Sequence, residues 1–422
     1  MAAAAAARAA SDDALAELLH PVTPAQFEES YWEKAALHIA DRSASTLHRR
    51  LLTAAELPAL AAALAAADVQ PQVFRDGERR PSRAPLQDFL QGGSLIVNRV
   101  DKLWPPIGRL CAALRRRLHH AFAVLYLTPR GSQAVRVHTD DQDVFVLQLA
   151  GSKEWRVYDA PQPLPYEDEQ LGKDAPYDRA RLGTHTLAAT LRPGSLLYLP
   201  RGMLHEARAG DDGGSLHVTI TVQTSDMTWG GFVADALRAV HRRHLDFRRA
   251  LPLDVPIELG ARGGGDGGDE AEGSAALQPR WEALLALTAA EADRGFEAAY
   301  AALCAKLRRH NDEQDAAVRA AAAAAAARPT PPLPPRLRLA AGLRVAAAPD
   351  GDGGDGRWHF ARGGQTMSLG LPPHLTPAVR ALCSADGCEW AAAPDADELE
   401  RAALAGRLLE LGVVERGLVE TR

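Results

Sequence analysis

The chain has 422 residues, of which 46% are hydrophobic, and a formal net charge of -6. The length allows two or three domains with sizeable cores, and the acidic balance excludes a protein that coats nucleic acid over its whole surface. Four scattered cysteines are typical of free thiols in a reducing compartment, and no uncharged apolar run approaches the ~20 residues of a membrane span. These features predict an intracellular, soluble protein.

The first third of the chain predicts short helices that alternate with short strands. Residues 1–12 are rich in alanine and predict a disordered tail, because they lack the leucine-rich core of a signal peptide. Thr23 and Thr53 are suitable N-cap residues for two of the helices. The expected helices cover residues 13–19, 24–32, 53–67, 85–91 and 105–122, and the expected strands cover residues 37–40, 69–74 and 94–97.

Residues 123–225 have a different pattern, in which short apolar runs alternate with Pro/Gly turns. Seven short strands at this spacing predict an all-β barrel or jelly roll. The expected strands cover residues 124–128, 144–149, 154–158, 185–191, 195–199, 204–209 and 216–223.

The remainder predicts helices separated by low-complexity segments. Residues 229–249 predict a basic helix, which we interpret as a solvated face beside a core stripe; contact with ribosomal RNA or with a basic-protein complex is the alternative. The expected stripe consists of Phe232, Ala236, Leu237 and Val240. A flexible linker over residues 256–279, a helical region over 280–318 and an Ala/Pro spacer over 319–335 follow. In the last segment, residues 336–422, helices are expected over 376–383 and 396–411 and strands over 337–345, 358–360 and 413–419.

A candidate metal site begins with His138 and Asp140. Side chains two residues apart point the same way on extended backbone, so this imidazole and carboxylate can converge on one ion. Non-haem Fe(II) oxygenases add a second histidine and keep the opposite coordination positions open. His205 is the best candidate, because it follows a buried strand that ends at a Pro-Arg-Gly turn. Six other histidines compete with it: His119, His120, His185, His217, His241 and His244.

Taken in order, these motifs resemble the JmjC-type 2-oxoglutarate oxygenases, and within them the ribosomal oxygenases. The likeness extends over residues 19–255. It rests on His138-x-Asp140, on Leu147-Gln148-Leu149-x-Gly151-x-Lys153-x-Trp155, on the stretch from Gly194 to His205, and on flanking motifs such as Tyr31-Trp32, Trp104-Pro105-Pro106 and Thr228-Trp229-Gly230. The resemblance implies a mixed α+β fold, in which a double-stranded β-helix of the jelly-roll or cupin type forms the core of a JmjC domain over residues 13–255.

The resemblance also implies a cofactor and a cosubstrate. His138, Asp140 and His205 would hold Fe(II), with O2 and 2-oxoglutarate as cosubstrates. Lys153 would pair with the far carboxylate of 2-oxoglutarate, where a charge-assisted hydrogen bond is strong inside a barrel. Hydroxyl groups of Tyr126 and Thr221 would assist. Thr219 lies on the same strand face as Thr221 and stays an alternative.

The implied activity is hydroxylation of a histidine in a ribosomal protein. Hydroxylation of a ribosomal arginine, demethylation of histone lysine and a non-catalytic cupin binding module are the alternatives. By the same resemblance, residues 280–318 would form a homodimer and residues 336–422 a winged-helix-like domain. For that domain we favour a structural or protein-contact role over nucleic-acid binding, because residues 349–355 are acidic. The expected location is the nucleus or nucleolus of a eukaryote, or the cytoplasm of a bacterium.

Overall fold

The chain is described by a computed structural model. The described residues are 13–40, 42, 45–75, 78–82, 84–133, 135–173, 175–250, 268–329, 332–347, 357–384 and 386–416. The predicted tail over residues 1–12 and part of the predicted linker, residues 256–267, therefore lie outside the described residues. The chain divides into two compact units, of which the first combines Met1–Ser225 with Asn311–Arg422 and the second is Asp226–His310.

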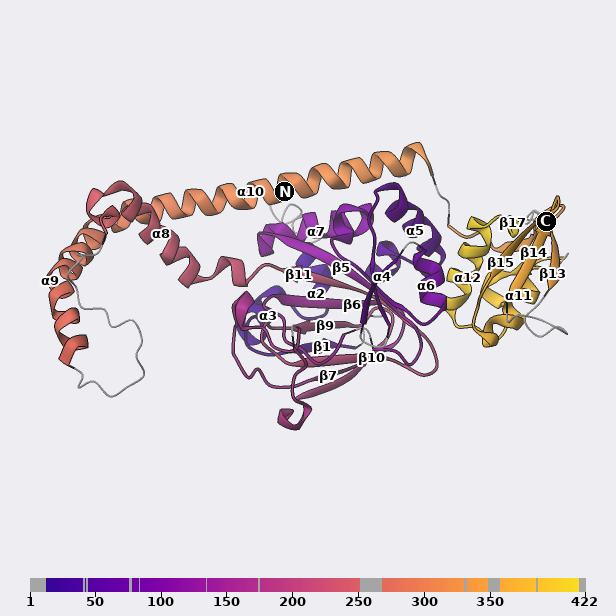
Figure 1. Ribbon diagram of the computed structural model, residues 1–422, viewed down its shortest axis with the longest axis horizontal. Helices are drawn as coiled ribbons and strands as arrows, with labels where there is room; N and C mark the ends of the chain where they lie inside the picture. The colour runs from indigo at the N-terminus through magenta and orange to yellow at the C-terminus, as the bar shows by residue number, and fades with distance from the viewer. Residues whose placement is uncertain are drawn as a thin grey trace, which may run out of the picture. The chain divides into compact units, whose positions relative to one another are not determined.

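Short helices and strands precede the barrel, as the sequence predicts (Figure 1). They are α2 (Ala14–Leu19), α3 (Pro24–Ser30), β1 (Leu37–Ile39), α4 (Leu47–Leu51), α5 (Leu57–Ala66), β2 (Gln72–Arg75), β3 (Glu78–Pro81), α6 (Pro85–Leu90), β4 (Ser94–Val97) and α7 (Pro105–Leu118). Thr23 caps α3 by accepting a hydrogen bond from the backbone N–H of Gln26. The helix predicted over residues 105–122 ends at Leu118, because the apolar run beyond it pairs with a later strand instead.

All seven strands expected between residues 123 and 225 are present. They are β5 (Ala121–Thr128), β6 (Asp143–Gly151), β7 (Lys153–Val157), β8 (Leu187–Leu191), β9 (Leu196–Leu199), β10 (His205–Ala209) and β11 (Ser215–Val222). Short 3-10 helices lie at Ala54–Glu56, Val100–Lys102, Glu167–Glu169, Arg179–Arg181, Ser225–Met227, Leu245–Arg248, Pro373–Leu375 and Trp390–Ala392.

The barrel strands form two sheets that face each other. The larger sheet has eight strands in the order β1-β9-β6-β11-β5-β4-β2-β3, and the smaller has the order β10-β7-β8. Between them lies an apolar cluster that includes Val144 and Leu197 of the large sheet and Trp155 and Val157 of the small one. A larger apolar cluster packs the helices and the C-terminal region against the large sheet. Strand β6 is buried along nearly its whole length. Its residues are therefore apolar at nearly every position and do not alternate between apolar and polar.

The second unit is helical. It contains α8 (Trp229–Arg243), α9 (Gly268–Ala290) and the first part of α10 (Ala292–Ala327), which continues into the first unit. Two sequence expectations need correction here. Helix α9 begins inside the predicted linker, and α10 runs through residues 319–327 of the predicted spacer. Alanine has the highest helix propensity, so the alanine run extends the helix until the prolines stop it. The expected core stripe of α8 is only partly buried, since Val240 alone is fully covered.

The C-terminal region is built from two small sheets and two helices. Its elements are β12 (Arg336–Leu339), β13 (Arg344–Ala347), β14 (Trp358–Arg362), β15 (Gln365–Leu369), α11 (Thr376–Leu382), β16 (Cys388–Glu389), α12 (Glu398–Glu410) and β17 (Val414–Arg416). The sheets have the orders β16-β12-β17 and β13-β14-β15. The strand predicted over residues 337–345 is two strands, because Gly342 adopts a left-handed turn conformation between them. None of the helices among the described residues has the length and apolar character to cross a bilayer.

Candidate active site

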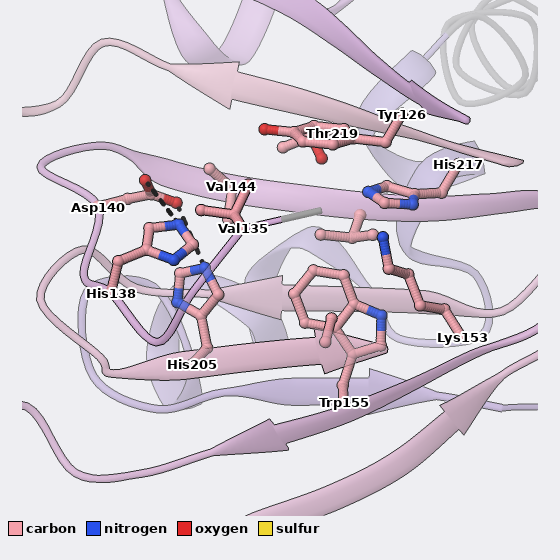
Figure 2. A pocket seen from close by; sticks show the side chains of 12 residues that line it. Tyr126, Val135, His138, Asp140, Val144, Lys153, Trp155, His205, His217 and Thr219 are labelled. Atoms are coloured by element: carbon pink, nitrogen blue, oxygen red, sulfur yellow. Dashed lines mark ion pairs between the residues drawn. The ribbon is translucent and has the colours of Figure 1, made fainter. Parts of the chain in front are cut away.

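Three side chains from two distant parts of the chain converge at one end of the barrel (Figure 2). His138 and Asp140 lie on the extended segment before β6, and His205 is the first residue of β10. Their possible ligand atoms all lie within 4.8 Å of one another. Asp140 carboxylate oxygens stand 3.7 Å from Nε2 of His138 and 3.7 Å from Nε2 of His205. Thr139 between them points the other way and accepts a hydrogen bond from the N–H of Leu171, as extended backbone requires.

Backbone contacts fix how the two imidazoles face the site. His138 and His205 exchange two backbone hydrogen bonds, of 3.2 and 3.0 Å, so their strands are paired at this point. Nδ1 of His138 lies 2.7 Å from the carbonyl oxygen of Arg136, and Nδ1 of His205 lies 3.0 Å from that of Met203. A carbonyl oxygen can only accept, so each Nδ1 donates a hydrogen bond to it, which leaves each Nε2 facing the centre of the site.

Electrostatics hold His138 and Asp140 in the protonation states that a metal ion needs. Burial and the neighbouring His205 lower the pKa of His138 to about 4, so this imidazole is neutral near pH 7. Burial alone would raise the pKa of Asp140, but Lys173 and the two imidazoles outweigh it and hold the pKa below its usual range. The ammonium of Lys173 lies 2.8 Å from Asp140 Oδ1. The carboxylate is thus ionised and already paired with one cation.

The other end of the same pocket contains a buried lysine. Lys153 begins β7, is only 2% exposed, and donates a hydrogen bond of 3.1 Å to Thr128 Oγ1. Its Nζ lies 5.7 Å from the ring centre of Tyr126. Burial lowers the pKa of Lys153 to about 7, and no carboxylate of the described residues pairs with it. A buried cation without an anion is costly, so this position is suited to an anionic ligand.

Two further polar atoms at this end lack partners. The ring of His217 stacks on Tyr126, with centres 4.7 Å apart, and burial followed by the charge of Lys153 lowers the pKa of His217 well below its usual value. Nδ1 of His217 and Nε1 of Trp155 are both buried without a hydrogen-bond partner among the described residues. Buried polar groups are nearly always satisfied, so these atoms are suited to a polar ligand or ordered water.

The pocket that joins the two ends has about 470 Å³ of space between its lining atoms, a volume that includes its open mouth. Its lining consists of Tyr126, Val135, His138, Asp140, Val144, Val146, Lys153, Trp155, His205, Ala207, His217 and Thr219. Figure 2 shows the triad at one end and Lys153 with His217 at the other. In the strand register, His205 pairs with Val157 and Lys153 with Ala209. The two backbone levels are therefore four residues, or roughly 13 Å, apart along the strand.

Five of the six residues predicted for this site line the pocket. His138, Asp140, His205, Lys153 and Tyr126 line one pocket, whereas Thr221 does not. The threonine that lines the pocket is Thr219, two residues earlier on the same face of β11. Both threonines are buried, and the alternation along a strand cannot distinguish residues on the same face.

Among the histidines that compete with His205, His217 lines the pocket, but at the lysine end rather than in the triad. His120 lies against Asn311 instead, with Nδ1 2.8 Å from the amide oxygen. Sequence reasoning missed the roles of His217, Trp155 and Lys173. The first two could have been found from the inward alternation of β11 and β7, but the position of Lys173 in a long loop gave no signal.

Comparison with known proteins places these residues in a named domain. The JmjC domain family matches residues 102–228, which include the triad and the pocket. The chain is 33% identical over 203 residues to the bifunctional lysine-specific demethylase and histidyl-hydroxylase NO66 of Dictyostelium discoideum, covering 46% of this chain and 38% of that protein. It is 31% identical over 264 residues to ribosomal oxygenase 1 of Rattus norvegicus, covering 58% of this chain and 43% of that protein. The chain thus spans less than half the length of these relatives.

The chain aligns with the structure of YcfD, a ribosomal oxygenase from Escherichia coli in complex with cobalt and 2-oxoglutarate, over 94% of this chain and 98% of that chain. The TM-score is 0.42 and the identity 18%. The resemblance to JmjC ribosomal oxygenases expected from the sequence motifs is confirmed, and so is a mixed α/β fold with a cupin-type core.

Proposed function

We propose that this chain, whose residues 102–228 match the JmjC domain, is an Fe(II)- and 2-oxoglutarate-dependent oxygenase. One observation carries the proposal. Three residues that could together hold a metal ion line the same pocket as a buried lysine, which has no anionic partner among the described residues. The donor set fits Fe(II), since two imidazoles and one carboxylate on one side leave the opposite positions open. When bound, the iron would supply activation of dioxygen for oxidation of a substrate carbon.

The residues of the chain would divide the remaining work. Lys153, Tyr126 and Thr219 would bind the far carboxylate of 2-oxoglutarate, while the keto-acid end faces the triad. His217 Nδ1 and Trp155 Nε1, which lack partners in the described chain, would contribute hydrogen bonds or hold ordered water. The apolar walls formed by Val144 and Val146 would keep bulk water from the reacting atoms.

The affinity for a dicarboxylate is expected to depend on pH through Lys153. The free protein has a pKa of about 7 at this residue, so above pH 7 it must take up a proton when the anion binds. Affinity should therefore be nearly constant below pH 7 and fall above it, by up to about tenfold per pH unit. Calorimetric titration of Mn(II)-loaded protein with 2-oxoglutarate from pH 6 to 9 measures this. An affinity that rises with pH would contradict it.

Within this reaction class, we propose a histidine of a ribosomal protein as the target. The names of the relatives support this choice, since they include a histidyl-hydroxylase and ribosomal oxygenases. A ribosomal arginine is the alternative residue. Histone lysine demethylation is a second alternative, which one relative's name also carries. A cytoplasmic or nucleolar location is part of the same proposal, because that is where ribosomal proteins are made or assembled.

The direct test is incubation of purified protein with Fe(II), 2-oxoglutarate and candidate ribosomal peptides. The expected result is formation of succinate together with a peptide that has gained one oxygen atom, located by fragmentation mass spectrometry. The His138→Ala variant should give neither product. Loss of a methyl group from a histone peptide would favour demethylation, and no succinate with any substrate would favour a non-catalytic cupin binding module.

We further propose that residues 280–318, most of which lie in the second unit, mediate homodimerisation together with the neighbouring α8. Eight of the eleven large apolar side chains that are exposed in the described part of the chain belong to residues 226–310. They are Trp229, Val233, Leu237, Leu245, Trp281, Leu285, Phe296 and Tyr300. Such a concentration of exposed aromatic side chains is typical of a protein interface. Contact between the basic residues of α8 and nucleic acid stays a prediction, and so does a winged-helix-like role for residues 336–422.

The double variant Trp281→Glu, Phe296→Glu is expected to convert a dimer into a monomer, because buried charges without partners oppose association. Size-exclusion chromatography with light scattering measures the mass. Tyr166→Glu, at an exposed aromatic outside this unit, is the matched control and should stay dimeric. A monomeric wild-type protein, or an unchanged mass for the double variant, would refute the proposed interface.

A further inference from the structure

The first turn of α12 carries two carboxylates that cap the helix. Asp397 Oδ1 accepts a hydrogen bond of 2.9 Å from the N–H of Glu400, and Glu400 Oε2 accepts one of 2.9 Å from the N–H of Asp397. This reciprocal arrangement is an ordinary way to begin a helix. It occupies only part of the capacity of each carboxylate, since each oxygen can accept two hydrogen bonds. The remaining capacity is directed at the barrel.

Asp397 contacts the connection between β10 and β11, which is in turn bonded to the residue before Lys153. Its Oδ2 accepts a hydrogen bond of 2.8 Å from the N–H of Gly214, the residue before β11. The carbonyl of Gly214 in turn accepts a hydrogen bond of 3.3 Å from the N–H of Ser152, which directly precedes Lys153. The chain is tightly packed here, because a Cβ added to Gly214 would lie 3.0 Å from the carbonyl oxygen of Thr128.

Glu400 contacts the segment that directly follows β5, the strand that ends at Thr128. Its side chain is almost fully buried and forms an ion pair with Arg130, two residues after Thr128. Thr128 supplies the hydroxyl that accepts the hydrogen bond from Lys153 Nζ. His374 provides a second partner for Glu400, with Nε2 2.9 Å from Oε1. The two carboxylates thus hold the backbone next to the lysine and the residue that its ammonium contacts.

We propose that Asp397 and Glu400 are positioning residues for Lys153, and that α12 thereby forms part of the structure that holds the cosubstrate. The inference rests on the proposed function, because it assigns the lysine end of the pocket to 2-oxoglutarate. Under this proposal, the C-terminal region contributes to binding of the cosubstrate in the barrel. Neither carboxylate touches the pocket, so both act through Gly214 and Arg130.

The alternative is that these contacts merely attach the C-terminal region to the barrel. The same region has another attachment that is independent of Lys153. Gln87 of α6 donates a hydrogen bond of 2.7 Å to the carbonyl of Gly370, between β15 and α11. Loss of this contact loosens the attachment without changing the surroundings of Lys153, which makes Gln87→Ala the matched control.

The sharpest variant is Asp397→Asn. Asparagine is as good an N-cap as aspartate, so its oxygen keeps the bond from Glu400 N–H and α12 stays capped. Its amide group then faces the N–H of Gly214, and two donors cannot bond. The dissociation constant of 2-oxoglutarate for the Mn(II)-loaded full-length protein is expected to rise roughly fivefold to tenfold, as loss of one hydrogen bond predicts. The affinity for Mn(II) alone should stay unchanged.

Calorimetric titrations of wild type, Asp397→Asn and Gln87→Ala, with thermal melts of each, decide the matter. Weaker 2-oxoglutarate binding in Asp397→Asn but not in Gln87→Ala supports the positioning role. Equal binding in all three, or equal loss in both variants, refutes it while the proposed function stands. A wild-type protein that binds Mn(II) but not 2-oxoglutarate refutes the proposed function and this inference together.

Discussion

The His205→Ala variant is expected to lose its metal ion. The substitution removes one of three ligands and leaves only His138 and Asp140, the latter still paired with Lys173. Even residues that merely orient a metal-binding histidine change metal affinity about 10–100-fold, so loss of a ligand itself should exceed that range. Titration of the metal-free protein with Mn(II), followed by electron paramagnetic resonance or calorimetry, measures the effect.

His185→Ala is the matched control for this experiment. His185 is an exposed histidine that lies against Tyr158, with ring centres 6.5 Å apart, and it competed with His205 on sequence grounds. This variant should bind Mn(II) with wild-type affinity. If His205→Ala also bound it normally, the assignment of the triad as the metal site would be wrong.

The Lys153→Met variant is expected to lose 2-oxoglutarate binding and to gain stability. The side chain is buried and its charge has no anionic partner in the described chain, so an apolar side chain of similar length removes a desolvation cost. We expect the free protein to become more stable by about 1–3 kcal/mol. The lost charge-assisted hydrogen bond should weaken dicarboxylate binding by about 2–4 kcal/mol, roughly thirty- to a thousandfold.

Opposite changes in stability and binding are the signature of a residue kept for its ligand. Denaturant unfolding of the metal-free protein and calorimetry of the Mn(II) form measure the two quantities. Lys34→Met, at an exposed lysine, is the control and should change neither by much. A Lys153→Met variant that is both less stable and fully able to bind 2-oxoglutarate would falsify the proposed cosubstrate site.

The barrel was the most predictable part of the fold. Its strands are short apolar runs bounded by Pro/Gly turns, and each predicted run falls on an observed strand. The boundaries were less predictable where local signals are continuous. The apolar run after α7 continues directly into β5, so the helix was predicted four residues too long. The alanines of α10 were taken for a spacer, although low complexity and high helix propensity coincide there.

The site was predictable where spacing constrains geometry. His138 and Asp140 share a face by alternation, and the family motif supplied His205 and Lys153. Thr219 rather than Thr221 lines the pocket, and the sequence could not separate the two because both lie on one strand face and differ only in position along the strand. The contacts that Lys173 and the capping residues of α12 make with the site and the barrel could not be anticipated, since they join segments that are far apart in sequence. Metal and cosubstrate binding by these residues stays a prediction.

The backbone pairing of His138 with His205 has a consequence for proteolysis. The two residues belong to distant parts of the chain that meet here through a pair of hydrogen bonds at one isolated bridge. A metal ion bound by both side chains would cross-link the two segments at this bridge and would suppress local opening of the barrel mouth. Chelator treatment should therefore expose the segments around His138 and His205 to proteases before the rest of the barrel unfolds.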